Sequence, residues 1–523
     1  MSVAAATSTV DVAVDPAPAP EPAAVKKTGV KTNVAFAWAA QVSAAVAGIL
    51  LMPLIFERVG QTVQGTWLLL NATAGYARLL YLGFGETTAR YVSLHAARRE
   101  WADLNRVGSC VHAVYLGSAT LVVSVAAVLS WLVPYLNDWG EIPVWELRVA
   151  TLLLGLNMAI GLAGSVYGGV LMGVQRFDLE RGTQIAITVL RVALVVLFLG
   201  SEHGLVTLAL VFTAVTLVEN GLFWWFAHRN VPTLKLTAHD LDRATVRKCF
   251  AFSSFAALGV ISEILIFTTD TVVIGFTLSA AATLPYVMAN RVSEMLRRPL
   301  EQLGVVVLPK AGELDAAGDK AGELRRLIVE SFALVFLLTC GFFIGSVFFG
   351  DLFLETWMGP GWGVSHAIMI LLVAALTIAM PVGLLRRVLI GVGEVRVPSA
   401  LLLAEAVLNL GLSLWLVRVS GLYGVALGTL IPVAVIEIFV LLPFASRRLS
   451  IPTMDLVEET ARRCAVPILA LTAFCAAVDR LPLAANWATL LAVTAGGGVV
   501  LLTTRFGFAV LTNPKAVLRG RAG

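Results

Sequence analysis

The sequence predicts an all-α membrane protein of about fourteen transmembrane helices, arranged as two six-helix lobes followed by two further helices. Composition, recurring apolar segments and an internal repeat support this prediction. Of 523 residues, 58% are hydrophobic and only 14% are charged, whereas soluble domains carry about 25% charged residues. Apolar segments recur along the chain, and each is long enough to cross a hydrocarbon core of roughly 30 Å. The chain is therefore expected to cross the membrane many times.

The fourteen predicted spans follow these apolar segments in order. They are 33–56, 64–92, 107–134, 147–173, 183–200, 205–227, 250–275, 281–309, 327–350, 364–388, 398–418, 421–445, 463–479 and 485–503. Loops after odd-numbered spans hold few basic residues, namely Arg58, Arg148 at a span entrance, Arg418 and Arg480. Nearly all other Lys and Arg residues outside the spans lie in the N-terminal tail or after even-numbered spans. Because basic loops stay cytoplasmic, both termini are predicted to be cytoplasmic.

An internal repeat supports the two-lobe arrangement. A shift of 218 residues places VLMGV (Val170–Val174) on VLIGV (Val388–Val392), and a shift of 219 places Arg78 on Arg297. The shift spans six helices, an even number, so the copies share one orientation about an axis along the membrane normal. The predicted units are a disordered cytoplasmic tail (1–30), an N-terminal lobe (31–229), a C-terminal lobe (250–448), two extra helices (463–503) and a basic cytoplasmic tail (504–523).

Several functional classes are excluded by the sequence. It contains no phosphate-binding G-x-x-x-x-G-K-[ST] loop, no nucleophile elbow and no histidine spacing typical of a metal site. The chain is therefore expected not to be an enzyme and to hold no cofactor or metal, with Na⁺ or H⁺ remaining as coupling ions. The net charge of +4 reflects basic loops that set topology and contact lipid headgroups. Nucleic acid is not an expected partner.

The eighth span carries an unusual amount of charge. Its segment ANRVSEMLRRPLEQLG holds Arg291, Glu294, Arg297, Arg298 and Glu301. A mid-bilayer arginine or aspartate costs about 2.5–3.5 kcal/mol, so these side chains cannot all face lipid. At 100° per residue they fit an arc of about 120°, which predicts a polar helix face lining a hydrated cavity. Internal ion pairs, such as Arg291–Glu294 or Arg298–Glu301, are the structural alternative.

Other polar residues interrupt apolar spans. Arg78 lies near the middle of the second span and matches Arg297 in the repeat. Two arginines at similar depth, one from each lobe, form a plausible clamp for an anionic group, because a guanidinium binds phosphate oxygens at two points. The remaining candidates would bind a coupling cation, line the cavity or neutralise arginines. They are Arg191, Glu219, Glu263, Asp270, Glu294, Glu301, Glu405, Asn409 and Glu437.

The second span resembles that of polysaccharide biosynthesis flippases. Within Val59–Ser93, a small-residue turn precedes Gly65 and Trp67, a leucine-rich stretch leads to Gly83, and the segment ends in ARYVS (Ala89–Ser93). The family usually has an acidic residue before that glycine, where this chain has Tyr-Leu. No role is therefore transferred to that position.

The eighth span extends the resemblance. The stretch Tyr286–Leu314 is similar to the corresponding helix of a superfamily that includes oligosaccharide-lipid flippases, the lipid II flippase and multidrug exporters. The resemblance covers roughly residues 33–503. It implies a multi-pass protein of the bacterial plasma membrane that moves a polyprenyl-diphosphate-linked oligosaccharide to the outer leaflet. Polysaccharide polymerase and glycosyltransferases are then the expected protein partners.

The arginines would hold the diphosphate of such a cargo. The candidates are Arg78, Arg291, Arg297 and Arg298. Two other functions remain open from the sequence. A cation-coupled exporter of drugs or metabolites would use the acidic residues for a cationic cargo. A scaffold recruiting glycan enzymes would need only the cytoplasmic loops, and the polar eighth span argues against it.

Overall fold

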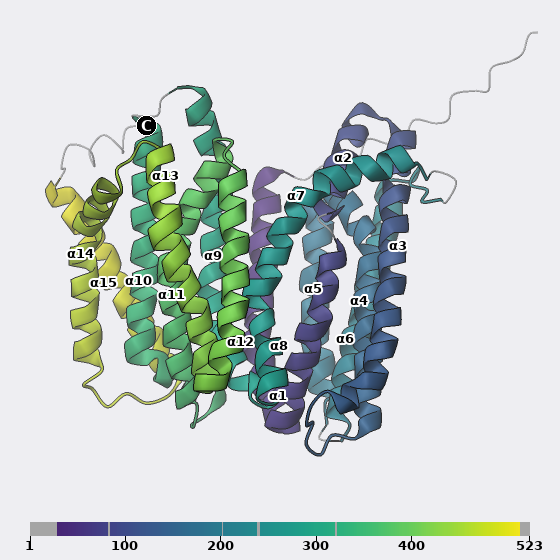
Figure 1. The fold of residues 1–523 in the computed structure, drawn as a ribbon, viewed down its shortest axis with the longest axis horizontal. Helices are drawn as coiled ribbons and strands as arrows, with labels where there is room; N and C mark the ends of the chain where they lie inside the picture. The colour runs from purple at the N-terminus through teal and green to yellow at the C-terminus, as the bar shows by residue number, and fades with distance from the viewer. Residues whose placement is uncertain (1–28, 82–83, 201, 238–240, 319–321, 513–523) are drawn as a thin grey trace, which may run out of the picture.

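The computed structural model describes residues 29–81, 84–200, 202–237, 241–318 and 322–512. Within these residues the chain is helical, and its helices stand side by side in two groups with α1 between them (Figure 1). The helices of the first group are α1 (Val30–Gly75), η1 (Tyr76–Tyr81), α2 (Phe84–Arg98), α3 (Trp101–Leu132), η2 (Val133–Tyr135), α4 (Val144–Gly173), α5 (Phe177–Phe198), α6 (Gly204–Asn230), α7 (Arg243–Phe267) and α8 (Thr269–Thr277). Those of the second group are α9 (Thr283–Ala316), α10 (Glu323–Met358), α11 (Gly363–Gly391), α12 (Arg396–Val433), the π-helix η4 (Ala434–Leu441), α13 (Leu442–Arg448), α14 (Thr453–Val478) and α15 (Trp487–Thr512).

The prediction of an all-α polytopic membrane protein is confirmed. In the described residues, 11 helical segments are long and apolar enough to cross a membrane. Two of them each cover more than one predicted span: Ala35–Leu80 covers most of the first and part of the second, and Arg396–Arg448 contains the eleventh and twelfth. The chain turns inside them at Gly60 and Gly421, whose φ angles of 74° and 57° favour glycine. The charged helix α9 is absent from the 11 because its composition is too polar.

The second and seventh predicted spans are interrupted rather than continuous. The second passes from α1 through the 3₁₀ helix η1 into α2, and the seventh breaks at Thr268 between α7 and α8. The two breaks meet, since the Tyr76 hydroxyl and the Thr269 hydroxyl share a hydrogen bond of 2.7 Å. Each break carries a polar residue. Arg78 lies within the 3₁₀ helix η1, and Asp270 lies in the first turn of α8. Short 3₁₀ segments of this kind are common at functional hinges.

Helix α7 begins with a side-chain cap. Asp242 accepts hydrogen bonds from the Thr245 hydroxyl and from the backbone N–H groups of Ala244 and Thr245. The pKa of the Asp242 carboxyl is lowered by the Thr245 hydroxyl and these backbone groups, because they favour its charged form. From this cap α7 runs beside α2 and α3 and also packs against α12. The helix therefore contacts both groups, and a lobe boundary between 229 and 250 stays a prediction.

Two glycines bring α9 and α11 into close contact. A Cβ atom on Gly391 would lie 2.5 Å from the backbone oxygen of Leu308, and one on Gly312 would lie 2.8 Å from the backbone oxygen of Gly391. Only glycine fits at such a crossing. One side of the contact is packed by buried apolar residues, including Ala311 and Val388. The crossing fixes the ends of α9 and α11 against each other, beside the polar residues described below.

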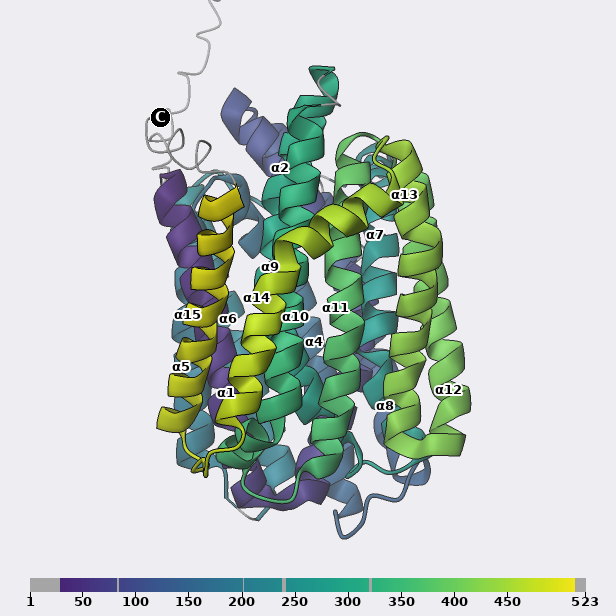
Figure 2. The ribbon, with the colours of Figure 1, turned by 90° about the vertical axis from the view of Figure 1, so that its left-hand side faces the viewer.

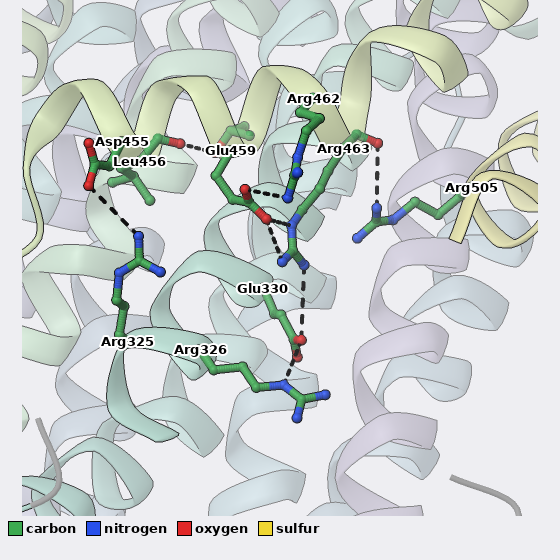
Figure 3. Close-up of polar contacts among 10 residues, drawn as sticks. Arg325, Arg326, Glu330, Asp455, Leu456, Glu459, Arg462, Arg463 and Arg505 are labelled. Atoms are coloured by element: carbon green, nitrogen blue, oxygen red, sulfur yellow. Dashed lines mark hydrogen bonds and ion pairs between the residues drawn. The ribbon is translucent and has the colours of Figure 1, made fainter. Parts of the chain in front are cut away.

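The last two helices pack against α10 through apolar clusters, and charged contacts join α14 to α10 and α15 to α14. Figure 2 shows α14 crossing in front of α10 and α11, with α15 beside it. In Figure 3, Glu330 of α10 pairs with Arg463 of α14 at 3.9 Å, and Arg463 pairs with Glu459 at 2.7 Å. Arg505 of α15 donates to the backbone oxygen of Arg463. Because these pairs are partly exposed, each is expected to contribute only about 0–1 kcal/mol.

Candidate functional site

A polar cavity of about 730 Å³ opens among α7, α8, α9, α11, α12 and η4. Its walls combine apolar residues such as Leu372 and Leu376 with an unusual number of charged side chains. The charged residues are Glu263, Asp270, Glu294, Arg297, Glu301, Arg386, Arg387, Glu405 and Glu437. Charged residues inside a membrane are rare and usually face an aqueous path, so this cavity is the candidate site.

The charged residues of α9 divide between two cavities. Glu294, Arg297 and Glu301 line the main cavity. Arg291 and Arg298, again with Glu294, line a second cavity of about 280 Å³ between α1 and α9. The predicted polar face is therefore present, but α9 presents it to two spaces rather than to one.

Ion pairs join the charged residues of α9. Glu294 is shared by three arginines, at 3.0 Å from Arg291, 3.6 Å from Arg298 and 3.9 Å from Arg297. Glu301 pairs with Arg297 at 2.8 Å, whereas the sequence suggested Arg298 as its partner. Arg297 is only 5% exposed, and its guanidinium carbon lies 3.8 Å from the centre of the Phe267 ring. Internal ion pairs, the alternative to a cargo-binding role, thus account for most of the charged side chains of α9 in this conformation.

Arg78 approaches the cavity from the other helix group. It lies on η1, 3.7 Å from Glu263 of α7, and both side chains are about half exposed. Glu263 and Phe267 are four residues apart, so they occupy one face of α7. Arg78 and Arg297 therefore contact neighbouring turns of α7, which is consistent with the two-arginine arrangement predicted from the repeat.

Arg386 and Arg387 are the charged lining residues that sequence reasoning missed. They lie at the end of the tenth predicted span (364–388) but were counted with the basic residues of the loop after it, whereas in the structure both are part of α11 and of the cavity wall. Arg386 donates to Glu405 at 3.5 Å and makes a closer contact with Glu437. A signal was available, because two buried glutamates on the following spans require a nearby cation.

Arg387 differs from the other arginines of the cavity. Among the described residues it has no ion-pair partner, whereas Arg297 and Arg386 each contact two carboxylates. Its side chain lies against Gly304 of α9, where an added Cβ would come 2.1 Å from the Arg387 Cδ atom. Glycine at this position leaves room for the arginine. The cavity thus holds one guanidinium whose donors are not already taken by a carboxylate of the described chain.

Asp270 lines the cavity and lies in a cluster of polar groups. It is 4% exposed and accepts hydrogen bonds from Tyr286 at 2.5 Å, Thr429 at 3.0 Å and Ser413 at 3.4 Å. Asn409 donates to the Thr429 hydroxyl at 3.0 Å, while its own buried Oδ1 has no hydrogen-bond partner. No lysine or arginine of the described residues pairs with Asp270. The cluster supplies oxygen ligands of the kind that small cations prefer.

Arg191 and Glu219 lie away from both cavities. They occupy α5 and α6, where the Arg191 guanidinium lies 4.9 Å from the centre of the Phe212 ring. Arg191 and Glu219 attract each other electrostatically. Their surroundings match the expectation that some intramembrane charges neutralise one another.

One group of potential metal ligands lies outside the cavities. The ligand atoms of His95, Glu100 and Asp103 all lie within 4.8 Å of one another. These atoms already have partners, because His95 shares a hydrogen bond of 2.7 Å with Glu100 and Asp103 pairs with Arg106 at 3.1 Å. The group is explained as a set of ion pairs around the start of α3.

Solved structures of transporters share this fold. The lipid II flippase MurJ in an inward closed conformation gives a TM-score of 0.67 at 12% identity, covering 92% of this chain and 100% of that one. A MATE multidrug resistance transporter of the MOP superfamily gives 0.63 at 16% identity when inward-facing, covering 80% and 96%. An outward-facing MATE structure gives 0.54 at 16% identity, covering 82% and 96%. At these identities the likeness concerns the fold.

The sequence itself matches a protein family. Residues 107–367 match the family described as polysaccharide biosynthesis protein. No curated protein sequence matches the chain. The solved structures that share the fold are those of transporters. The chain belongs to the polysaccharide biosynthesis protein family and has the fold of MurJ and the MATE proteins.

Proposed function

We propose that this transporter moves a polyprenyl-diphosphate-linked oligosaccharide from the cytoplasmic to the outer leaflet of the bacterial plasma membrane. The diphosphate and sugars of such a lipid cannot cross hydrocarbon unaided, whereas its polyprenyl tail can remain in lipid beside the protein. The polar cavity supplies the aqueous environment that the headgroup needs. The residues that line the cavity all lie between 259 and 437, in the predicted C-terminal lobe. Rocking of this lobe against the predicted N-terminal lobe would carry the cavity from one side of the membrane to the other.

The observation that carries this proposal is a pair of arginines in the main cavity, Arg297 on α9 and Arg387 on α11 beside α9. Arg387 has no carboxylate partner in the described chain, and it lies beside Gly304. Gly304 is seven residues after Arg297, about two helical turns or roughly 10 Å along the helix. A diphosphate bound at Arg387 can therefore also reach Arg297 by displacing Glu301. Arginine suits this exchange because it binds carboxylate and phosphate oxygens in the same two-point manner.

The remaining arginines have supporting roles in the proposal. Arg78 joins the headgroup from the opposite helix group once its contact with Glu263 opens. Arg291 and Arg298, about half exposed in the cavity between α1 and α9, meet the headgroup as it leaves the lipid. The headgroup would then pass from the second cavity into the main cavity around Glu294, which lines both.

Alanine variants test these roles. R78A and R297A are each expected to abolish glycan export, because each removes one side of the anion site. R291A and R298A are expected to reduce export without abolishing it, because each leaves the other arginine in place. Export is measured as surface glycan in a deletion strain carrying each variant at matched membrane levels. Normal export in both R78A and R297A would show that these two arginines do not form the anion site.

The coupling cation is assigned to the Asp270 cluster. Its carboxylate, the hydroxyls of Ser413 and Thr429 and the unpartnered Asn409 oxygen fit a small cation, with Na⁺ and H⁺ as the two candidates. If Na⁺ binds, adding NaCl in place of choline chloride raises the melting temperature of the purified protein, because a ligand of the folded state stabilises it. D270N is expected to lose this increase, whereas E263Q, at the cavity rim, keeps it.

The melting temperature of D270N decides which cation the cluster binds. An equal increase in D270N would place any sodium site elsewhere. No increase in the unaltered protein, together with a pH-dependent change that D270N removes, would assign the cluster to H⁺.

A cation-coupled exporter is the second candidate function. Six of the nine charged lining residues are acidic, a balance that would suit a cationic drug or metabolite. Four of these six carboxylates contact the Arg297 and Arg386 guanidiniums, which limits their attraction for such a cargo. A deletion strain is expected to show unchanged susceptibility to cationic dyes. Strong sensitisation, reversed by the unaltered gene, would favour the exporter.

A further inference from the structure

Two buried glutamates share one guanidinium at the wall of the main cavity. Glu405 lies on α12 and is 4% exposed, and Glu437 lies on η4 and is completely buried. The Arg386 Nη2 atom contacts both carboxylates. With both glutamates ionised, the group carries one negative charge that Arg386 does not balance.

Other charged groups around the pair do not supply the missing positive charge. On α11, Arg387 is turned toward Gly304 of α9. Across the cavity on α9, Arg297 is held by Glu301. On α13, which packs against η4, Arg448 pairs with Glu394.

The charged groups of the remaining neighbours are also engaged or exposed. Arg447 at the end of α13 and Arg418 on α12 are exposed. On the described part of α7, which packs against α12, Glu263 pairs with Arg78. Asp270 of α8 is satisfied within its own cluster of hydroxyls.

The backbone around Glu437 is also unusual. Residues Ala434–Leu441 form a π-helix within an otherwise α-helical segment. Such wide turns are rare, cost stability and occur frequently at functional sites. Glu437 lies in the middle of this turn, and its buried Oε2 atom has no hydrogen-bond partner. The residue is one of those that line the cavity, and the oxygen itself is shielded from solvent.

We propose that Glu405 and Glu437 form a proton-binding site that holds one proton between them, while Arg386 balances the remaining carboxylate. A second ionised carboxylate without a cation would cost several kcal/mol in this low-dielectric position, and one proton removes that cost. The unpartnered Glu437 oxygen is an atom that can carry this proton. The site is distinct from the Asp270 cluster, which involves neither glutamate.

The place of this proton in transport rests on the proposed function, whereas its presence does not. A diphosphate next to Arg387 would also attract the adjacent Arg386 guanidinium. Movement of Arg386 toward the phosphate would leave both glutamates without their cation and would increase their affinity for protons. Proton binding and cargo binding at this wall would then favour each other.

Infrared spectroscopy tests the site directly. The full-length protein is purified, reconstituted in phosphatidylcholine vesicles at neutral pH in Na⁺-free buffer, and compared in H₂O and D₂O for the carbonyl band of a protonated carboxylic acid. We expect this band in the unaltered protein. E437Q and E405Q should each lose the same component, because the single remaining glutamate pairs with Arg386 as a carboxylate. D270N should keep that component.

Each other outcome overturns the proposal. A spectrum without the band, or a band that neither glutamine variant changes, would show that both glutamates are ionised or that a group other than a proton neutralises them. A band that disappears when NaCl is added would assign the place to Na⁺. Since no cargo is present, the measurement is independent of whether the protein moves a glycan. Using both glutamine variants keeps the test valid if one of them does not fold.

Discussion

Replacing Arg387 with alanine is expected to abolish glycan export while the protein still folds and inserts. Among the described residues, Arg387 is the cavity arginine without a carboxylate partner. Its loss therefore leaves no buried carboxylate without a cation. Hydrogen bonds to charged groups contribute about 1.5–3 kcal/mol. At about 1.4 kcal/mol per factor of ten, binding of the diphosphate should fall roughly ten- to a hundredfold. The measurement is surface glycan in a deletion strain carrying R387A.

Two variants serve as controls for R387A. R418A removes an exposed arginine of α12 that lines neither cavity and should export normally. R387K keeps the charge but loses the planar two-point donor, so we expect partial export. Normal export by R387A at normal membrane levels would exclude Arg387 from cargo binding. Loss of the protein from the membrane would instead assign it a structural role.

Replacing Arg386 is expected to destabilise the protein itself. R386A leaves the buried Glu405 and Glu437 without their cation, and removing one partner of a buried ion pair costs about 3–5 kcal/mol. The expected result is a large loss of folded protein, measured by thermal unfolding of purified protein and by its abundance in membranes. R462A provides the comparison, because its exposed pair with Glu459 is expected to contribute only about 0–1 kcal/mol.

A combined variant identifies the cause of the loss. Replacing Arg386 with methionine and both glutamates with glutamine removes every charge of the group. Replacement of a complete buried ionic group by neutral residues is often tolerated. The triple variant should therefore recover much of the stability lost in R386A. A triple variant as unstable as R386A would show that the arginine acts through packing rather than through charge.

Hydropathy and charge predicted the membrane fold well because both are local properties. Fourteen apolar segments were recognised; the glycine turn at Gly60 lies between two predicted spans, and that at Gly421 lies at the start of the twelfth. The break at Tyr76–Tyr81 was not predicted, since its apolar residues suit a continuous helix as well as a 3₁₀ turn. Such a turn depends on partners far along the chain, here Thr269.

The candidate site was predicted only in part, because side-chain pairing also depends on partners far along the chain. The charges of α9 were recognisable from sequence because lipid cannot solvate them. Which arginine pairs with which glutamate depends on side-chain directions and on neighbouring helices, so Arg298 was assigned the wrong partner. Arg386 and Arg387 were missed because a basic pair near the end of a span resembles a cytoplasmic loop. Their place in the cavity wall became evident only from the packing of α11 against its neighbours.

Lipid extracts from a strain lacking this protein test the central claim most directly. Intact cells are first treated with a membrane-impermeant periodate reagent, which modifies only glycans of the outer leaflet. The lipids are then extracted and separated, and modified and unmodified polyprenyl-diphosphate glycans are measured. The account predicts that completed glycan lipids accumulate on the cytoplasmic leaflet and that their sugars identify the cargo. Unchanged amounts and an unchanged distribution of these lipids would contradict the flippase assignment.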